Sequence, residues 1–211
     1  MASITQDYDT AVEVPADPTR TGYTFAGWQP ALPETVPASN VTFTAQWKAN
    51  GLVVTFDANG GTVEESERVV DKGNAVGTLP EPTRKGYTFT GWFTEESSGT
   101  QIKATTKVKK SVTYYAHWTA NKYKIKFNAN GGTGTAMNTL SATYGKNVTL
   151  TANAFKRTNW TFLGWATKKD ATEAKYTDKQ KVKNLTATDG KTVTLYAVWK
   201  RNTYTDRKSV V

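Results

Sequence analysis

The sequence predicts a mainly β protein, with little or no helix, built from tandem copies of one small module. Two aromatic-rich signatures recur three times, in the same order, along the 211 residues. Around them apolar and polar residues alternate with a period of two, which is the pattern of a strand with one face on a core. Aromatic residues make up 12% of the chain, and large rings favour strands over helices. Helical periodicity is weak, and single helical turns are expected only within 101–110 and 170–183.

The two signatures define the repeat, and both are expected to form strands. The first reads Gly-Tyr-Thr-Phe-x-Gly-Trp, with Asn and Trp as its first two residues in the third copy, and the second reads Val-Thr-x-x-Ala-x-Trp. They occupy residues 22–28 and 41–47, 86–92 and 112–118, and 159–165 and 193–199. The predicted domains are an N-terminally truncated repeat at 1–48, complete repeats at 49–119 and 120–200, and a C-terminal tail at 201–211.

An opening strand precedes the signatures in the two complete repeats, and residues 1–48 contain no copy of it. Tyr123, Ile125 and Phe127 alternate with lysines, so this apolar set is expected to face the core. An Asn-Gly-Gly sequence follows the strand, and these residue types tolerate the positive φ of a tight turn. The turns at 59–61 and 130–132 therefore predict hairpins into second strands around 66–70 and 139–144.

The aromatic positions of these strands form the predicted core. The alternative is that the Trp rings are stacking platforms for glycans, and core packing is favoured more strongly for the second-signature Trp, which shares a face with Val and Ala. Trp92 alternates onto the face opposite Tyr87 and Phe89, so part of its ring is expected to be exposed. The predicted core residues are Trp47, Trp118, Trp199, Phe56, Phe127, Tyr87, Phe89 and Phe162.

At these residues the chain resembles the Listeria–Bacteroides repeat, the B-repeat of internalin-type surface proteins. The matching residues are Phe-Asp-Ala-Asn-Gly-Gly at 56–61, the segment 82–92 and the strand 112–118. The resemblance implies a β-grasp-like small domain, strung in tandem on secreted or wall-attached bacterial proteins. It also implies a stalk or adhesion segment without catalytic residues.

The third repeat and the tail depart from this pattern. Asn128 replaces Asp57, Phe155 replaces a proline, and Asn159 replaces a glycine, so a different loop is expected before the third strand of this repeat. The tail starts at 202–204 like another repeat. Asp206 and Lys208 then stand where inward-facing apolar residues would be required.

No catalytic or metal-binding constellation is visible, and we expect no catalytic residue, metal or cofactor. The chain has no cysteine. Its one histidine, His117, is expected to be a solvated or half-buried strand residue, because no partner for a base or a ligand accompanies it. Asp57 and Asn59 superficially resemble a calcium loop, but such a loop needs several carboxylates at alternating positions, so a turn is favoured. An intramolecular Lys–Asn or Lys–Asp crosslink is not favoured, since no Lys/Asn/Glu trio is constant between repeats.

The positive charge lies in the third repeat and the tail. Residues 120–211 carry 17 Lys and Arg against 5 Asp and Glu, a net charge of +12, whereas 1–48 carries −3 and 49–119 is neutral. Such a field attracts polyanions, for example sulfated glycans or wall teichoic acids; the alternative is a solvated Lys-rich surface. Nucleic acid is not expected, because no recognition element accompanies the charge. The candidate polyanion-binding residues are Lys156, Arg157, Lys168, Lys169, Lys175, Lys179, Lys181 and Lys183.

These features predict an elongated, beads-on-a-string array that serves as a non-catalytic stalk or spacer of a bacterial cell-surface adhesin or internalin-like protein. The alternative is a binding module whose basic third repeat contacts anionic glycans, wall polymer or a host surface protein. No apolar run approaches the roughly 18 residues of a membrane span. We expect an extracellular location on the bacterial surface, with signal and anchor outside these residues, and a monomer or weak oligomer.

Overall fold

The computed structural model describes residues 5–14 and 16–204. Within them the chain forms twelve strands and no helix, so the predicted mainly β class is confirmed. The helical turns expected within 101–110 and 170–183 do not form in this part of the chain, and that prediction is wrong. Gln101 and Lys107 instead form isolated bridges with Phe93 and Ala75, and residues 181–182 form a short strand. Several backbone groups of these loops pair with neighbouring segments, such as Ile102 with Trp92 and Leu150 with Gln180, and only single turns without helix form between residues three apart.

The chain divides into two compact units. One comprises residues 1–82 with 91–117, and the other comprises 83–90 with 118–211. This division assigns the start of the first signature of the second repeat, 83–90, to the same unit as the third repeat. The repeat boundaries expected from the sequence stay a prediction.

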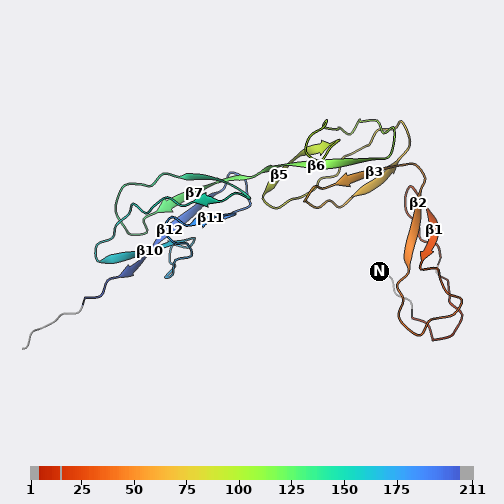
Figure 1. Ribbon diagram of the computed structural model, residues 1–211, viewed down its shortest axis with the longest axis horizontal. Helices are drawn as coiled ribbons and strands as arrows, with labels where there is room; N and C mark the ends of the chain where they lie inside the picture. Colours follow the sequence, from red (N-terminus) through yellow and green to blue (C-terminus); the bar gives the residue numbers. More distant parts are fainter. Residues whose placement is uncertain (1–4, 15, 205–211) are drawn as a thin grey trace, which may run out of the picture. The chain divides into compact units, whose positions relative to one another are not determined.

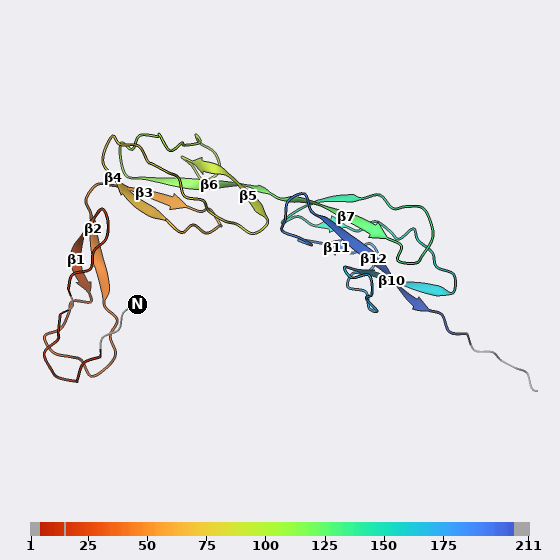
Figure 2. The ribbon, with the colours of Figure 1, turned by 180° about the vertical axis from the view of Figure 1, so that it is seen from behind.

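The second repeat forms one mixed four-stranded sheet. Its strands are β3 (Leu52–Asp57), β4 (Glu67–Val70), β5 (Tyr87–Phe93) and β6 (Val112–Ala120), in the order β4-β3-β6-β5. β3 pairs antiparallel with β4 and parallel with β6, and the strands β3 and β6 run side by side in Figures 1 and 2. A central parallel pair flanked by antiparallel strands is the sheet order of a β-grasp domain, here without its helix. The hairpin predicted into 66–70 is confirmed.

The third repeat repeats this order and adds a small two-stranded sheet. Its strands are β7 (Lys122–Asn128), β8 (Leu140–Thr143), β10 (Trp160–Ala166) and β12 (Thr192–Arg201), ordered β10-β12-β7-β8, with β9 (Val148–Thr149) paired to β11 (Lys181–Val182). The hairpin predicted into 139–144 is confirmed. Phe155 is buried, as Pro82 is in the second repeat, so the ring takes over the position of the proline. Asp206 and Lys208 of the tail lie outside the described residues.

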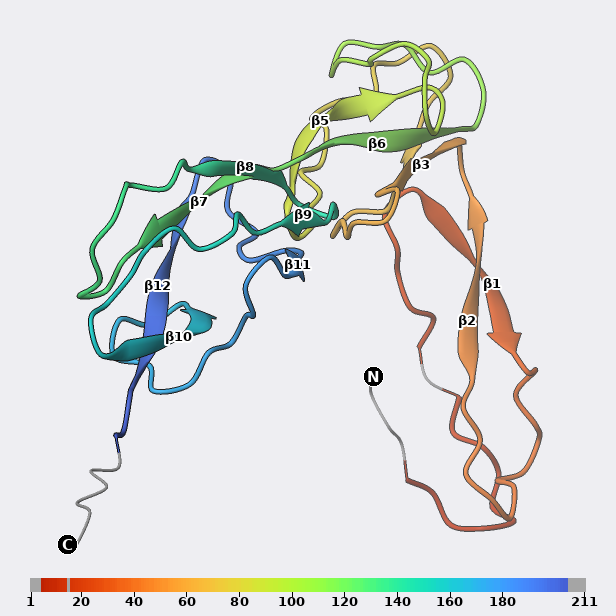
Figure 3. The same ribbon diagram turned by 60° about the vertical axis from the view of Figure 1, so that its left-hand side comes forward.

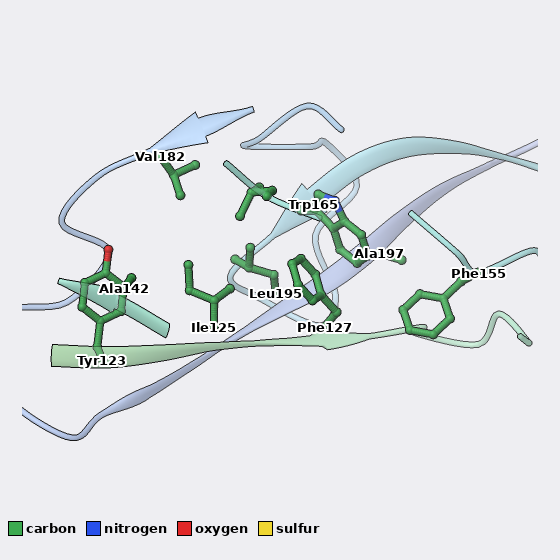
Figure 4. Close-up of a cluster of buried hydrophobic side chains, with 10 residues drawn as sticks. Tyr123, Ile125, Phe127, Ala142, Phe155, Trp165, Val182, Leu195 and Ala197 are labelled. Atoms are coloured by element: carbon green, nitrogen blue, oxygen red, sulfur yellow. The ribbon is translucent and has the colours of Figure 1, made fainter. Parts of the chain in front are cut away.

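The core of the third repeat lies between the central strand pair and the loops that cross it. On β7 the predicted alternation is confirmed, because Tyr123, Ile125 and Phe127 are 5% exposed or less while the lysines between them are exposed. Figure 4 shows these side chains meeting Leu195 of β12. At one end Val182 lies above Tyr123, and at the other Trp165 and Phe155 cover Phe127.

A bulge in the first-signature strand decides which Trp is buried. The pairing of β10 with β12 shifts register between Phe162 and Gly164, and Gly164 and Gly91 share a positive φ near 142° and 141°. A bulge adds one residue to a strand and re-aims the side chain that follows. Trp92 and Trp165 are therefore 0% exposed, and the prediction that part of Trp92 is exposed is wrong. Of the predicted core residues, Phe56 and Phe127 are buried, whereas Trp47, Trp118, Trp199, Tyr87, Phe89 and Phe162 are half-buried.

The first repeat is a two-stranded hairpin. β1 (Tyr23–Gln29) pairs antiparallel with β2 (Thr44–Ala49), and Figure 3 shows this pair beside the loop that joins it. Phe25 contacts Trp28 and Trp47 edge to face at centroid distances of 5.4 and 5.8 Å, but all three remain half-buried. The strand predicted from residue 41 begins only at Thr44.

Candidate functional site at the repeat junctions

A turn of constant geometry precedes the first-signature strand in every repeat. We call the segments 20–24, 84–88 and 157–161 the junction loops. Each begins with Arg and ends with an aromatic residue and Thr, and its third residue has a φ of +80°, +82° or +62°. The backbone N–H of the aromatic residue donates to the backbone carbonyl of the Arg at 3.0, 3.1 and 3.0 Å, and the guanidinium lies 3.9, 4.1 and 3.9 Å from the centre of the aromatic ring. Positive φ at this turn position suits Gly or Asn, which explains the residues found there.

Two hydrogen bonds fix each junction loop to the residue that follows the last strand of the repeat. Asn121 follows β6, its N–H donates to the carbonyl of Gly86 at 2.9 Å, and its side-chain oxygen accepts from the Thr88 hydroxyl at 2.7 Å. The same pair of bonds joins Asn50 to Gly22 and Thr24, at 2.8 and 2.7 Å. It also joins Asn202 to Asn159 and Thr161, at 2.9 and 2.7 Å. The end of each repeat is thus held by one recurring Thr–Asn arrangement.

At two of the three loops, a side chain from the following repeat packs against the glycine. A Cβ placed on Gly22 would lie 2.8 Å from Cβ of Val69, and one on Gly86 would lie 2.2 Å from the ring of Tyr144. The ring of Tyr144 also meets Tyr87 edge to face at 5.8 Å, and its N–H donates to the carbonyl of Asn121 at 2.8 Å. A residue with a side chain at either position would therefore clash with Val69 or with the ring of Tyr144 unless that neighbour shifted.

The first junction adds an ion pair to this packing. The guanidinium of Arg20 pairs with the carboxylate of Glu67, and the Tyr23 hydroxyl donates to the same carboxylate at 3.1 Å. Burial and then the hydrogen bond to Glu67 raise the pKa of Tyr23 above its ordinary value of 10.0. In the second repeat, burial alone raises the pKa of Tyr114.

The third junction loop differs, because Asn159 is exposed and carries the side chain that the other two loops exclude. Trp160 stands where Tyr23 and Tyr87 stand, with Arg157 over its ring. Side chains cannot pack here as they do on Gly86, since the Cβ of Asn159 occupies that space.

The Asn-Gly-Gly turns are built by hydrogen bonding. Oδ1 of Asp57 accepts from the N–H of Asn59 at 2.8 Å, and Oδ1 of Asn128 accepts from the N–H of Asn130 at the same distance. Because an amide does the same work as the carboxylate, the interaction needs an oxygen and no charge. In the described part of the chain, no group of three or more His, Cys, Asp or Glu residues could hold a metal ion.

His117 is a half-buried residue of β6. Its ring stacks on Phe93 at 3.9 Å with the planes 7° apart, and Nε2 lies 2.9 Å from the carbonyl oxygen of Glu95. That oxygen can only accept, so Nε2 carries the hydrogen of this bond. The stacking and the hydrogen bond give His117 a structural role at the end of the sheet.

The structure places the predicted polyanion-binding residues in two groups. All of them are exposed except Arg157, which is half-buried. Lys156 and Lys169 flank the 130–132 turn, because their carbonyls accept from Thr133 N–H at 2.7 Å and from Asn130 Nδ2 at 2.8 Å. We call Lys156, Arg157, Lys168 and Lys169 the turn-end group, and Lys179, Lys181 and Lys183 the β11 group.

The two groups lie at opposite ends of β7. The β11 group lies next to Val182, whose side chain lies near Tyr123 at the start of β7 (Figure 4), whereas the turn-end group flanks the 130–132 turn that follows the end of β7 at Asn128. Lys175 belongs to neither group and lies over the ring of Tyr176 at 5.6 Å. The eight residues are therefore not brought together on one surface.

Sequence reasoning missed the Thr–Asn bonds of the junctions. Their signal was present, because Asn50, Asn121 and Asn202 each follow a second-signature strand by a few residues. Residues 121 and 88 are far apart in sequence, however, and no local pattern joins them.

Comparison with known proteins places these repeats in a family. The profile of the Listeria–Bacteroides repeat domain matches residues 2–48, 53–117 and 123–198. A putative membrane protein of Evansella cellulosilytica is 28% identical over 97% of this chain and 30% of its own length. Internalin H of Listeria monocytogenes is 32% identical over 56% of this chain and 23% of its own length.

A putative Gly-rich membrane protein of Evansella cellulosilytica is 30% identical over 97% of this chain, which spans 24% of that relative. The chain thus covers less than a third of each of these relatives. No solved structure matches significantly, and the described residues contain no helix long and apolar enough to cross a membrane. The profile covers most of the chain in three successive matches, and the chain belongs to the Listeria–Bacteroides repeat family.

Proposed function

We propose that the chain is a non-catalytic spacer in a bacterial surface protein, in which the junction loops join consecutive repeats. Its relatives support a surface location, since one is named as an internalin and two as putative membrane proteins. Each of them is more than three times as long as the matched part. That length leaves room for binding and anchoring regions elsewhere in such proteins.

The short connection at Asn121, which is bonded to the junction loop around Gly86, carries this proposal. β6 ends at Ala120 and β7 begins at Lys122, so one residue separates two sheets. That residue, Asn121, donates through its side chain to the carbonyl of Ala187 at 2.7 Å, in addition to its bonds with 86 and 88. The connecting residue is thus hydrogen-bonded to segments before and after it within one compact unit, an arrangement that suits a spacer.

A replacement experiment tests the spacer role. The chain, displayed on a bacterial surface with an epitope at its free end, is compared with an unrelated, non-binding array of β domains of equal residue number. Antibody access to the epitope should be equal for the two, and neither should attach cells to host cells or to a glycan array above background. Attachment by this chain, lost on replacement, would contradict the proposal.

The exposed basic groups of the third repeat favour a second candidate function, binding of an anionic glycan, a wall polymer or an acidic host protein. None of these lysines is paired with a carboxylate among the described residues. Their charge therefore remains available to a polyanion.

Heparin chromatography separates the two basic groups. Gln substitution of the turn-end group or of the β11 group is compared with substitution of Lys107, Lys109 and Lys110 in the second repeat. If one group binds, substitution of that group alone should move elution to much lower salt. Each contact between a basic side chain and a sulfate releases counterions, so binding through several such contacts depends steeply on salt concentration. Equal small shifts for all three variants would reduce the effect to net charge and remove this candidate.

A further inference from the structure

The outer face of the sheet of the third repeat carries a row of three lysines. Lys122, Lys124 and Lys126 of β7 are exposed, while the apolar residues between them are buried. Figure 4 shows those apolar side chains on one side of β7, and alternation along the strand places the lysines on the other. We call these three residues the lysine row; they belong neither to the turn-end group nor to the β11 group.

The positive charge of the lysine row is not balanced within the sheet. The strands β7, β8, β10 and β12 contain no acidic residue. No ion pair joins the row to a carboxylate within residues 5–14 and 16–204. Asp189 lies beside Lys122 but accepts from its backbone N–H, at 2.8 Å. An anion on this face therefore gains the attraction of three like charges that otherwise repel one another.

The usual structural reason for lysines on a strand does not apply to this row. Edge strands often carry Lys, because its charge opposes pairing with another chain. β7, however, lies between β12 and β8, and the edge strands β10 and β8 contain no lysine. The fold itself does not require lysine here, since the second repeat has Val53 and Thr55 at the positions equivalent to 124 and 126. The row therefore indicates a surface for an anionic partner.

Hydroxyl side chains flank the row on both neighbouring strands. The residues paired with the row all carry a hydroxyl: Thr143 and Ser141 on β8, and Thr192 and Thr194 on β12. Each hydroxyl can donate and accept hydrogen bonds. Tyr196, an aromatic residue of the same face, is half-buried and lies opposite Asn128, past the last lysine. The face thus suits a chain of phosphate and polyol groups, whereas a single-stranded nucleic acid needs rings on which successive bases stack.

The spacing of the lysines favours one length of repeating unit. Side chains two residues apart on one face of a strand are about 6.7 Å apart along it. Two residues contain six backbone bonds, and a glycerol phosphate unit also contains six chain bonds from one phosphorus to the next. The two extended chains therefore present their charges at nearly equal intervals. A ribitol phosphate unit has eight such bonds, so its charges fall out of step with the row.

We propose that the lysine row is a binding site for a linear glycerol phosphate polymer of the bacterial wall, extended along β7. The proposal rests on the second candidate function, binding by the basic third repeat, and assigns the contact to residues outside the two groups named there. Lysine suits this role, because its ammonium is a compact point charge that binds phosphate without the fixed fork of arginine.

The experiment measures binding of the whole chain to a synthetic glycerol phosphate polymer over a series of salt concentrations. The test variant replaces the three lysines of the row by Thr, because Thr suits a strand and stands at one equivalent position of the second repeat. The matched control replaces Lys107, Lys109 and Lys110 by Thr, which removes the same charge from the second repeat. Thermal unfolding checks that both variants keep the fold.

Loss of the row should weaken binding at low salt about a hundredfold, because each lysine near an anionic surface contributes about fivefold. The slope of log affinity against log salt should fall by about 2, the share of three phosphate contacts on a single strand. The control should lower affinity less than about threefold, since exposed charges away from the contact are screened. A ribitol phosphate polymer with as many phosphates should bind the wild-type chain more weakly.

Five results would overturn the proposal. Absence of polymer binding by the wild-type chain would remove the site and leave the heparin comparison to decide the second candidate function. Equal losses for the test and control variants would reduce the effect to net charge. Binding that depends on the turn-end or β11 group and not on the row would keep the second candidate function and remove this site. Equal binding of the two polymers would show that the spacing of the lysines selects nothing. Tighter binding of a single-stranded oligonucleotide with as many phosphates, lost with the row, would identify a nucleic acid as the occupant.

Discussion

The first and third repeats share both signatures and differ in what covers them. In the third, β7 lies beside β12, and Trp165 is fully buried against Phe127 at 4.8 Å. In the first, β2 has no such neighbour among the described residues, and the ring of Trp28 contacts Phe25 of its own hairpin. The signatures alone thus specify a hairpin with an aromatic face, and the opening strand turns that face into a core.

The second and third junction loops also differ in what covers the residue with positive φ. Gly86 is buried under Tyr144, whereas Asn159 is exposed. Both hold a positive φ and the same two bonds to an asparagine. Glycine is thus required at this position for packing, since the turn itself accepts asparagine.

Removal of the buried Trp should separate the first and third repeats most clearly. Trp165→Ala should destabilise the third repeat by about 3–5 kcal/mol, the usual cost of deleting a buried aromatic ring. Trp28→Ala should cost less than about 2 kcal/mol, because its ring is already half in water. Urea unfolding followed by residue-specific exchange measures both; equal costs would mean that the core of the first repeat is complete.

Gly86→Ala tests whether packing explains the glycine. A Cβ at this position meets the Tyr144 ring, so overpacking of about 1–3 kcal/mol should add to the cost of a non-glycine residue at positive φ. Asn159→Ala is the matched control, since it places the same residue in the same turn without that contact. Thermal unfolding should show a large shift for Gly86→Ala and a small one for Asn159→Ala. Similar shifts would assign the whole effect to backbone strain.

Period-two alternation predicted β7 and its inward face, and the Asn-Gly-Gly turns predicted both hairpins. Alternation failed at Trp92, because a bulge at Gly91 changes the face of every residue after it and leaves no mark in the alternation. It failed again at residues 41–43, where strand formation depends on a neighbour that the local sequence does not contain. The candidate polyanion-binding residues lie close in sequence, but in the fold the turn-end group and the β11 group lie near opposite ends of β7.

Alkaline pH should weaken the first and second repeats through two tyrosines that the third lacks. The pKa values of Tyr23 and Tyr114 are raised in the folded state, so the fold favours their protonated forms. Their contribution is complete below the ordinary value of 10.0 and is lost as pH rises through the folded pKa. At the equivalent positions the third repeat has Trp160 and Leu195, which do not titrate.

Melting temperatures measured from about pH 8 to 11 check this expectation, with the sign given by proton linkage. Tyr114→Phe should flatten the alkaline fall of the second repeat and leave the third unchanged. An equally steep fall in that variant would assign the effect to other groups.

The smallest effect is expected at the Asn-Gly-Gly turn, where the second and third repeats differ by one atom type. Asp57→Asn should change stability by less than about 0.5 kcal/mol, because Asn128 makes the same bond to the backbone two residues on. Asp57→Ala should cost about 1 kcal/mol, the usual net value of one hydrogen bond.

Calcium should leave the melting temperatures of the wild-type chain and of both Asp57 variants unchanged. A calcium-dependent rise in the wild-type chain, lost in Asp57→Asn, would show that the carboxylate holds an ion and that the second repeat does more than its neighbour. Equal behaviour would instead mean that charge at this turn is free to vary, as the Asn of the third repeat already indicates.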